Sequence, residues 1–208
     1  MNYYHRPQSL RSTHPEEGRP RRWTADEFLQ MVYAGIVGQS ERVELIGGEI
    51  VQMSAKGNRH EIVRSELTIF WSDRRAKVYK IVSEPPLRLS EHDEPEPDII
   101  VFPASQNVAQ VTAASVTLVV EVADSSLSYD LEVKAPLYAA FGVREYWVID
   151  PKTLTTTVHR TPTEKGYADI TEAGPDTQLT PLLAPELAVR LADLGIEPEP
   201  VTPSTTSP

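Results

Sequence analysis

The stretch TLVVEVA, residues 117–123, places a glutamate inside an apolar run. Val119, Val120 and Val122 are β-branched, and a short apolar run between polar residues predicts a strand that is buried on both faces. A carboxylate taken out of water in such a strand costs several kcal/mol unless its charge is compensated. Glu121 therefore needs a cationic partner, a metal ion or a raised pKa. The alternative to a functional role is a buried carboxylate that bonds an Arg or a Tyr.

Length and composition indicate a single soluble domain. The chain has 208 residues, 40% of them apolar, and no cysteine, so disulfides and thiolate metal ligands are excluded. The lack of cysteine fits a reducing cytosol, and the N-terminal residues contain no apolar segment typical of a secretory signal, so we expect a cytoplasmic protein. No apolar run approaches the roughly 18 residues of a membrane span, so we expect no membrane partner.

The charge is distributed unevenly along the chain. A net charge of −10 and a pI of about 5.0 argue mildly against a nucleic-acid partner. However, residues 59–80 contain six Lys or Arg against three carboxylates, and residues 90–98 contain five carboxylates and no Lys or Arg. This pattern fits either a phosphate-facing surface beside a metal site or two ordinary solvated surfaces.

Pattern and turn signals predict one α/β domain between two tails. Residues 1–22 and 196–208 are polar and rich in Pro, and we expect a flexible N-terminal tail and a disordered C-terminal tail around a domain at 23–195. The expected helices run from the capping box at Thr24 to about residue 34, from Asn58 to about residue 75, and from a cap at Ser128 or Asp130 to Gly142.

Strands are expected on both sides of these helices. A Gly-Gly turn at 47–48 predicts a hairpin. Further strands are expected at 77–89, 97–103, 117–123 and 144–150, with peripheral strands at 153–160 and around residue 167. The order of elements predicts an α/β fold with a mixed central β-sheet flanked by helices. Alternation along 144–150 puts Tyr146 and Trp147 on opposite faces, and we expect both in the core.

Two carboxylates lie in or beside the predicted buried strands. Asp98 opens the strand PDIIVFP, and Glu121 follows 23 residues later. If the strands are neighbours, the carboxylates repel each other unless a divalent cation lies between them or one is protonated. Oxygen ligands suit Mg²⁺ or Mn²⁺, whereas the scattered histidines argue against a zinc site. Asp98 as a cap of the turn after Pro97 is the alternative.

Lys134 is the third candidate. A helix that folds back across the Glu121 strand could direct its ammonium group at the carboxylates, where it would orient a water molecule and stabilise charge on a phosphate. The alternative is an Asp130–Lys134 pair on the helix surface, which contributes only a few tenths of a kcal/mol.

Four segments together resemble the Uma2 family of the PD-(D/E)XK nuclease superfamily. They are ERVELIGGEIVQMS at 41–54, RH at 59–60, PDIIVF at 97–102 and EVADSSLSYDLEVKAPLYAAFGVREYWVIDP at 121–151. The resemblance extends over roughly residues 23–195. It implies a restriction-endonuclease-like core and a Mg²⁺- or Mn²⁺-dependent phosphodiesterase site.

The resemblance also assigns roles to residues. Asp98 matches the Asp of the PD motif and Glu121 the acidic position of (D/E)XK, which makes both metal ligands and catalytic residues. The motif lysine would fall at position 123, which is alanine here, and the resemblance implies that Lys134 on the following helix replaces it. Glu44 corresponds to a family glutamate near the site, which implies a further catalytic residue that binds the metal or a water molecule; the alternative is a polar residue on an exposed hairpin. His60 could reach the site from its helix or lie on the surface.

The predicted function is metal-dependent endonucleolytic cleavage of DNA. In this interpretation a divalent ion shared with Asp98 neutralises Glu121 in its apolar strand. The alternative is a non-catalytic module that binds nucleic acid or protein on a nuclease scaffold, because a fold does not fix a function. Ala123 and the acidic composition favour that alternative. A homodimer would supply the two sites needed to cut both strands, although no heptad pattern indicates one.

Overall fold

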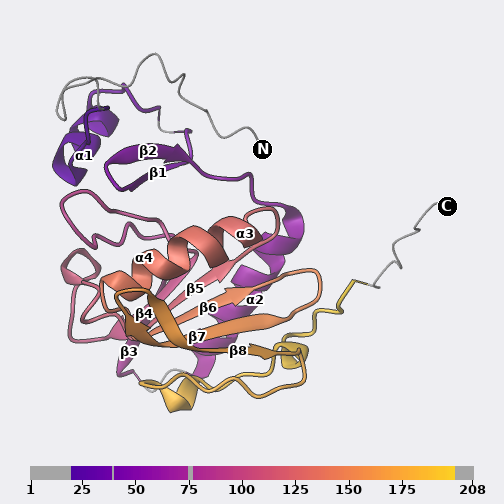
Figure 1. Cartoon of the computed structure of the whole chain (residues 1–208). Helices are drawn as coiled ribbons and strands as arrows, with labels where there is room; N and C mark the ends of the chain where they lie inside the picture. The colour runs from indigo at the N-terminus through magenta and orange to yellow at the C-terminus, as the bar shows by residue number, and fades with distance from the viewer. Residues whose placement is uncertain (1–19, 39, 75–76, 200–208) are drawn as a thin grey trace.

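The computed structural model describes residues 20–38, 40–74 and 77–199 (Figure 1). It confirms the expected α/β fold with a mixed central sheet flanked by helices. Six strands form this sheet in the order of the chain: β3 (Tyr79–Ser83), β4 (Ile99–Pro103), β5 (Leu118–Val122), β6 (Glu145–Ile149), β7 (Thr156–Thr163) and β8 (Gly166–Ala173). Strands β5 and β6 are parallel, and all other neighbouring strands are antiparallel.

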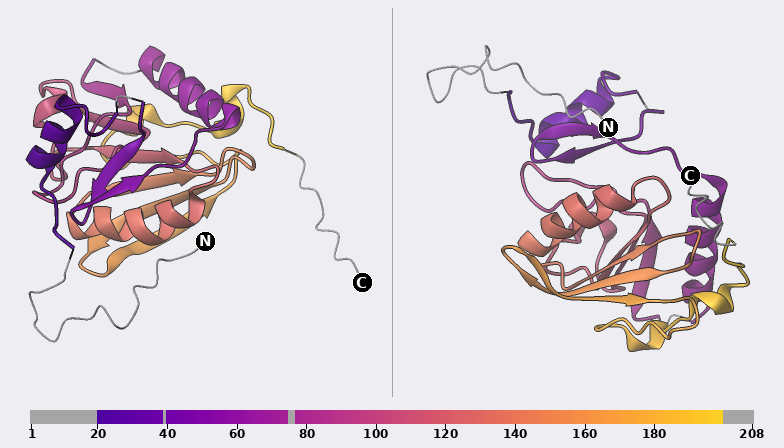
Figure 2. Two further views of the ribbon diagram at one scale, coloured as in Figure 1. Left: turned by 90° about the horizontal axis from the view of Figure 1, so that it is seen from above. Right: turned by 45° about the vertical axis from the view of Figure 1, so that its right-hand side comes forward.

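The parallel pair requires a crossover connection, and residues 127–140 provide it as one helical segment. This segment consists of α3 (Leu127–Tyr129), a π-helical turn (Asp130–Lys134) and α4 (Ala135–Ala140). It covers one face of the sheet. Helix α2 (Asn58–Arg74) covers the opposite face, as Figure 2 shows. The site described below lies where this crossover leaves β5.

Two hydrophobic clusters fill the space on either side of the sheet. On the α2 side, Trp71 packs against Trp147, with ring centroids 6.0 Å apart. On the other side, Tyr138 of α4 packs against Tyr146, with centroids 4.9 Å apart. Tyr146 and Trp147 are neighbours in β6 and point to opposite faces, both fully buried, as the alternation in the sequence predicts.

The N-terminal elements form a small layer beside this core, at the top of Figure 1. Helix α1 (Ala25–Tyr33) starts with the predicted capping box between Thr24 and Glu27. Strands β1 (Val43–Ile46) and β2 (Glu49–Gln52) form a separate two-stranded hairpin. Both turn glycines, Gly47 and Gly48, have positive φ angles of 59° and 77°, which explains the Gly-Gly pair.

The C-terminal part completes the α2 side of the core without regular strands. Two short 3₁₀ helices, Pro185–Leu187 and Leu191–Leu194, contribute three buried leucines there. The indole N–H of Trp71 donates a hydrogen bond to the carbonyl of Leu187 (2.7 Å). Among the described residues, no helix is both long and apolar enough to cross a membrane.

Several element boundaries differ from the sequence-based expectations. The strand expected at 77–89 ends at Ser83, because Glu84 has a left-handed backbone (φ 54°) and two prolines follow. The third main helix begins at Leu127, so Ser128 and Asp130 lie inside it and do not cap it. The connection between β4 and β5 contains one short 3₁₀ turn, Val108–Gln110.

The expected tails fall largely outside the described residues, namely at 1–19 and 200–208. Where the described chain begins, the Arg22 Cα lies only 3.0 Å from an ideal Cβ built on Gly48. Near its end, the amide of Glu199 donates to the carbonyl of Lys152 (2.7 Å).

Candidate active site

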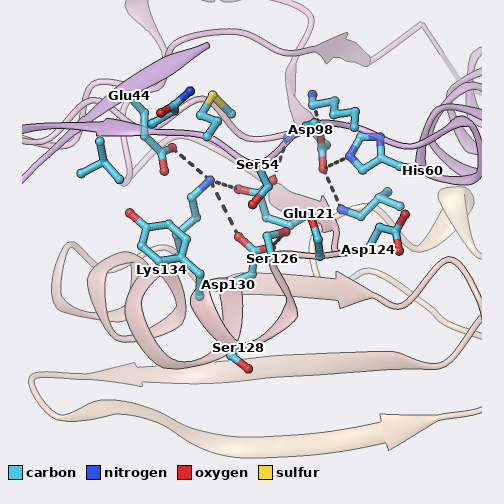
Figure 3. Close-up of a pocket in the computed structure, with 18 residues that line it drawn as sticks. Glu44, Ser54, His60, Asp98, Glu121, Asp124, Ser126, Ser128, Asp130 and Lys134 are labelled. Carbon is cyan, nitrogen blue, oxygen red and sulfur yellow. Dashed lines mark hydrogen bonds and ion pairs between the residues drawn. The ribbon is translucent and has the colours of Figure 1, made fainter. Parts of the chain in front are cut away.

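A cavity of about 300 Å³ opens where the crossover helix leaves β5. The hairpin β1–β2, the loop before α2, the start of β4, the end of β5 and the helical segment 127–140 all contribute to its wall. All four residues predicted to form the site, together with His60, line this cavity (Figure 3): Glu44, Asp98, Glu121 and Lys134. Their catalytic and metal-binding roles stay predictions, but their convergence on one cavity is an observation.

The register of β4 and β5 brings Asp98 beside Glu121. Ile99 is paired with Val120 in this antiparallel pair, so the next residue on each strand, Asp98 and Glu121, meet across the ladder on the same face. The amide of Asp98 donates to Glu121 Oε2 (3.1 Å). In return, Asp98 Oδ2 accepts a hydrogen bond from the amide of Val122 (2.8 Å). Backbone donors therefore fix both carboxylates, and Asp98 is more than a turn cap.

Lys134 is the cation that compensates Glu121. Its Nζ lies 3.0 Å from Glu121 Oε1 and 3.0 Å from Glu44 Oε2, and 3.9 Å from Asp130 Oδ1. The side chain is 4% exposed, so the alternative of an exposed Asp130–Lys134 surface pair is wrong. The ammonium group points inward, in the direction that the sequence argument expected. Lys134 thus supplies one positive charge beside Glu121, and neutralisation of Glu121 by a divalent ion shared with Asp98 stays a prediction.

The π-helical turn explains how the chain aims Lys134. The amide of Ala135 donates to the carbonyl of Asp130, which is five residues earlier instead of four. Pro136 follows directly, and the widened turn accommodates a residue that lacks an amide and would clash in a regular α-helix. Tyr146 OH also donates to the Asp130 carbonyl (3.2 Å) and so holds this turn against β6.

Glu44 lies on the inner face of β1 and is 2% exposed, so its alternative role as an exposed hairpin residue is wrong. Besides the contact with Lys134, Glu44 Oε2 accepts a hydrogen bond from the amide of Glu96 (3.3 Å). The hairpin thereby joins the acidic segment at 90–98 to the site. Within that segment, Asp93 Oδ1 accepts the amide of Gly47 (2.6 Å) and so stabilises the hairpin turn.

His60 reaches the site from the first turn of α2. It is 4% exposed, which excludes the surface alternative, and its Nε2 lies 2.9 Å from Asp98 Oδ2. Lys56, in the loop before α2, was not predicted: its Nζ lies 2.7 Å from Asp98 Oδ1 and also contacts Glu84. The sequence contains no signal for this contact, because the irregular path of residues 53–57 has no periodicity that would orient a side chain.

Burial and neighbouring charges shift the acidities of these groups in opposite directions. Burial would raise the pKa of Asp98, but His60 and Lys56 outweigh it and hold the pKa well below its ordinary value. Burial raises the pKa of Glu121, and Asp98, Asp130 and Glu44 add to this rise while Lys134 opposes it.

The pKa values of two groups on the helical segment 127–140, Asp130 and Lys134, are also shifted. Burial raises the pKa of Asp130 to about 6, although Lys134 and the Ser126 hydroxyl oppose the rise. Burial lowers the pKa of Lys134, but the carboxylates of Glu121, Glu44 and Asp130 outweigh it and raise the pKa overall, so the lysine is charged.

The donor chemistry of the cavity fits a hard divalent cation. Among residues 20–38, 40–74 and 77–199, no group of three or more His, Asp or Glu side chains is arranged to hold a metal ion. Lysines contact carboxylate oxygens of Asp98 and Glu121. Acidic groups nevertheless outnumber ammonium groups in the cavity wall: Glu44, Asp98, Glu121, Asp124 and Asp130 against Lys56 and Lys134. This excess of oxygen ligands and negative charge suits Mg²⁺ or Mn²⁺.

A mixed sheet with an Asp–Glu pair on two adjacent strands and an inward lysine defines a restriction-endonuclease-like domain. The chain belongs to the Uma2 family: the family model, described as "Putative restriction endonuclease", matches residues 25–192.

Five chains of known structure also match. One is a crystal structure of a putative nuclease belonging to DUF820 from Anabaena variabilis, with a TM-score of 0.67 and 22% identity over 82% of this chain and 96% of that one. At this identity the similarity concerns the fold. No protein of curated function matches the sequence.

Proposed function

We propose that this protein is an endonuclease that hydrolyses DNA phosphodiester bonds with the help of Mg²⁺ or Mn²⁺. The observation that carries the proposal is the convergence of Asp98, Glu121 and the ammonium group of Lys134 in one cavity. Membership of the Uma2 family supports nuclease chemistry. The proposal adds the substrate, the metal and the residue roles.

Asp98 and Glu121 would hold the ion, and Glu44 is the candidate for a further ligand of the ion or of a water molecule. A bound divalent ion supplies positive charge that polarises the phosphodiester and helps to activate water. Asp98 is already oriented by His60 and by the amide of Val122.

Glu121 is oriented by the amide of Asp98 and lies 3.5 Å from Tyr138 OH. These hydrogen bonds fix the orientation of both carboxylates before a cation arrives. Lys134 contributes the fixed positive charge of the site. Negative charge develops on the phosphate oxygens during hydrolysis, and a preorganised, buried ammonium group stabilises that charge strongly. Because Lys134 also neutralises Glu121, it performs one task in the resting protein and a second task when a phosphate arrives.

A nucleic-acid-binding module without catalysis is the second candidate. Two observations favour it: position 123 is a buried alanine packed in the core, and the carboxylates are engaged by lysines. The two candidates differ in one outcome, since only the enzyme breaks a phosphodiester bond.

A plasmid-nicking assay with Mn²⁺ or Mg²⁺ tests the proposal. We expect wild type to convert supercoiled DNA to nicked and linear forms, and Glu121→Gln to lower the rate by at least about 100-fold, the usual effect of removing a key electrostatic group. Glu132→Gln is the matched control, because Glu132 lies on the same helical segment but is exposed, and it should cut like wild type. Wild-type protein that binds DNA and leaves it intact with either ion would support the binding module instead.

A further inference from the structure

Lys56 has a position that nuclease chemistry alone does not explain. Its side chain is 9% exposed, and its Nζ lies 2.7 Å from Asp98 Oδ1 while it also contacts Glu84. We infer that Lys56 is a displaceable counter-ion: a divalent cation that binds Asp98 must drive the Lys56 ammonium group off that carboxylate and onto Glu84. This inference rests on the proposed metal site and adds a residue that sets its affinity.

The two oxygens of Asp98 have different kinds of partner. Oδ2 is engaged by the amide of Val122 (2.8 Å) and by His60 Nε2 (2.9 Å), which are fixed by strand β5 and helix α2. Oδ1 contacts the flexible side chain of Lys56. A cation ligated by Asp98 would therefore use Oδ1, since only this oxygen can be released without moving a strand or a helix.

Lys56 and a divalent ion cannot share this oxygen. Ligand oxygens lie about 2.0–2.6 Å from Mg²⁺ or Ca²⁺, and an ammonium group at 2.7 Å from the same atom would lie almost in contact with the ion. At so short a distance the divalent ion and the ammonium group repel each other strongly. Binding of the ion and departure of the ammonium group are thus one exchange.

Glu84 is placed to receive the displaced charge. Its side chain is 36% exposed, and its amide donates to the carbonyl of Asp98 (3.1 Å), so the two residues lie side by side where β3 ends and β4 begins. Glu84 has a left-handed φ of 54°, which is unfavourable for a residue other than glycine. This backbone conformation accompanies a carboxylate that faces both Lys56 and Arg42.

Lys134 cannot act as a displaceable counter-ion, although it also contacts a predicted metal ligand, Glu121. It lies within 4 Å of three carboxylates, those of Glu44, Glu121 and Asp130, and it is anchored in a helix with 4% of its side chain exposed. Lys56 has one deep carboxylate and one at the more exposed edge, and it lies in a loop. The site therefore combines one permanent and one replaceable lysine.

Titration calorimetry of the full chain with Mn²⁺ tests this exchange. Lys56→Met keeps the length and apolar stem of the side chain and removes the competing charge. We expect its Kd for Mn²⁺ to fall by at least about tenfold, which corresponds to about 1.4 kcal/mol. The melting temperature without added Mn²⁺ should fall, because Asp98 loses a partner, and Mn²⁺ should restore it.

Lys152→Met is the matched control for net charge. Lys152 Nζ lies 2.7 Å from Asp124 Oδ1, and Asp124 also lines the cavity. Lys152 does not contact Asp98. We expect this variant to change the Mn²⁺ affinity by less than about twofold, because an exposed pair contributes little at ordinary ionic strength.

Glu84→Gln should change the Mn²⁺ affinity in the direction opposite to Lys56→Met. Without its second carboxylate, Lys56 should hold Asp98 more firmly and weaken Mn²⁺ binding, whereas the same change in a Lys56→Met background should have no effect. Such non-additivity separates an action through Lys56 from a general change in charge.

The outcomes separate the inference from the proposed function. Mn²⁺ binding by wild type that is lost in Asp98→Asn supports the metal site. The exchange is wrong, although the metal site stands, if Lys56→Met then binds Mn²⁺ no more tightly than wild type. The same holds if its affinity for Mn²⁺ rises no more than that of Lys152→Met. If neither wild type nor Lys56→Met binds Mn²⁺, both fail.

Discussion

At the scale of single residues, one lysine explains why a glutamate can occupy an apolar strand. Lys134 lies within 3.0 Å of both Glu121 and Glu44 and carries the positive charge that these buried groups require. A buried carboxylate left without such a partner is strongly unfavourable. Stability and the proposed catalysis therefore depend on the same ammonium group.

Lys134→Met should for this reason destabilise the protein as well as stop DNA cleavage. We expect the free energy of unfolding to fall by about 3–5 kcal/mol, the usual cost of removing one member of a buried ion pair. Urea denaturation measures this loss. Adding Glu121→Gln should recover part of the stability, because the uncompensated charge is removed, but it should not recover cleavage.

Lys165→Met provides the control, because Lys165 is exposed in the turn between β7 and β8. It should change the free energy of unfolding by less than about 0.5 kcal/mol. A Lys134→Met protein that is as stable as this control would contradict the proposed role of Lys134 in charge compensation.

The sequence predicted which side chains gather around the cavity better than it predicted their partners. Asp98 and Glu121 stand out because carboxylates beside or inside apolar strands are costly, and Glu44 and Lys134 because they match a family pattern. Lys56 has neither signal. Its contact with Asp98 depends on an irregular loop, whose path follows from tertiary packing and not from local periodicity.

At the scale of elements, the hairpin β1–β2 is what carries Glu44 to the cavity. The amide of Gly48 donates to the carbonyl of His92 (2.7 Å), and that of Leu45 to the carbonyl of Glu94 (3.3 Å). These bonds anchor the hairpin to the acidic segment, so the position of Glu44 depends on the close approach of the turn to its surroundings.

The two turn glycines give a matched test of this anchoring. A Cβ added at Gly48 would lie 2.6 Å from the Arg22 Cβ and 3.0 Å from its Cα, whereas a Cβ at Gly47 would meet nothing within 4 Å. Both positions have positive φ, so both alanine variants carry similar backbone strain.

We expect Gly48→Ala to lower the free energy of unfolding by at least about 1 kcal/mol more than Gly47→Ala, since only Gly48→Ala forces backbone apart. Thermal unfolding of the two variants measures the difference. Equal melting temperatures would show that the contact with Arg22 does not anchor the hairpin.

Most elements were predictable, but one helix was not located correctly. Strong alternation and the Gly-Gly turn predicted the strands and the hairpin. The start of the crossover helix was placed at Ser128 or Asp130 because both residue types favour caps, yet Asp130 lies inside the helix, where its carboxylate accepts a hydrogen bond from Ser126 Oγ (2.6 Å). A local rule cannot foresee a π turn that tertiary contacts stabilise.

At the scale of the whole molecule, the irregular C-terminal segment is as much a part of the core as the sheet is. Leu187 is fully buried against the α2 side of the sheet, and its carbonyl accepts the indole N–H of Trp71. The sequence predicted a domain up to residue 195 but not this packing, because a segment without helical or strand periodicity does not indicate which of its residues are buried.

Leu187→Ala should therefore destabilise the protein by about 2–5 kcal/mol, the range for removing a large aliphatic side chain from a core. Leu183→Ala is the matched control four residues earlier, where the side chain is 40% exposed, and it should cost less than about 1 kcal/mol. Denaturation followed by the fluorescence of the core tryptophans compares the two. Similar losses would mean that the segment is not an integral part of the folded unit.

The π turn at Asp130–Lys134 has a consequence for how this chain can vary among its relatives. The turn holds one residue more than an α-helical turn, so it offsets the helix before it from the helix after it by about 100°. This offset lets Asp130 and Tyr138 both face the neighbourhood of Glu121. A one-residue deletion within this stretch would yield a regular α-helix. Either Asp130 or Tyr138 would then no longer face Glu121. In functional relatives that share this turn, gaps should therefore be absent between the positions of Asp130 and Tyr138, even where the residue types change.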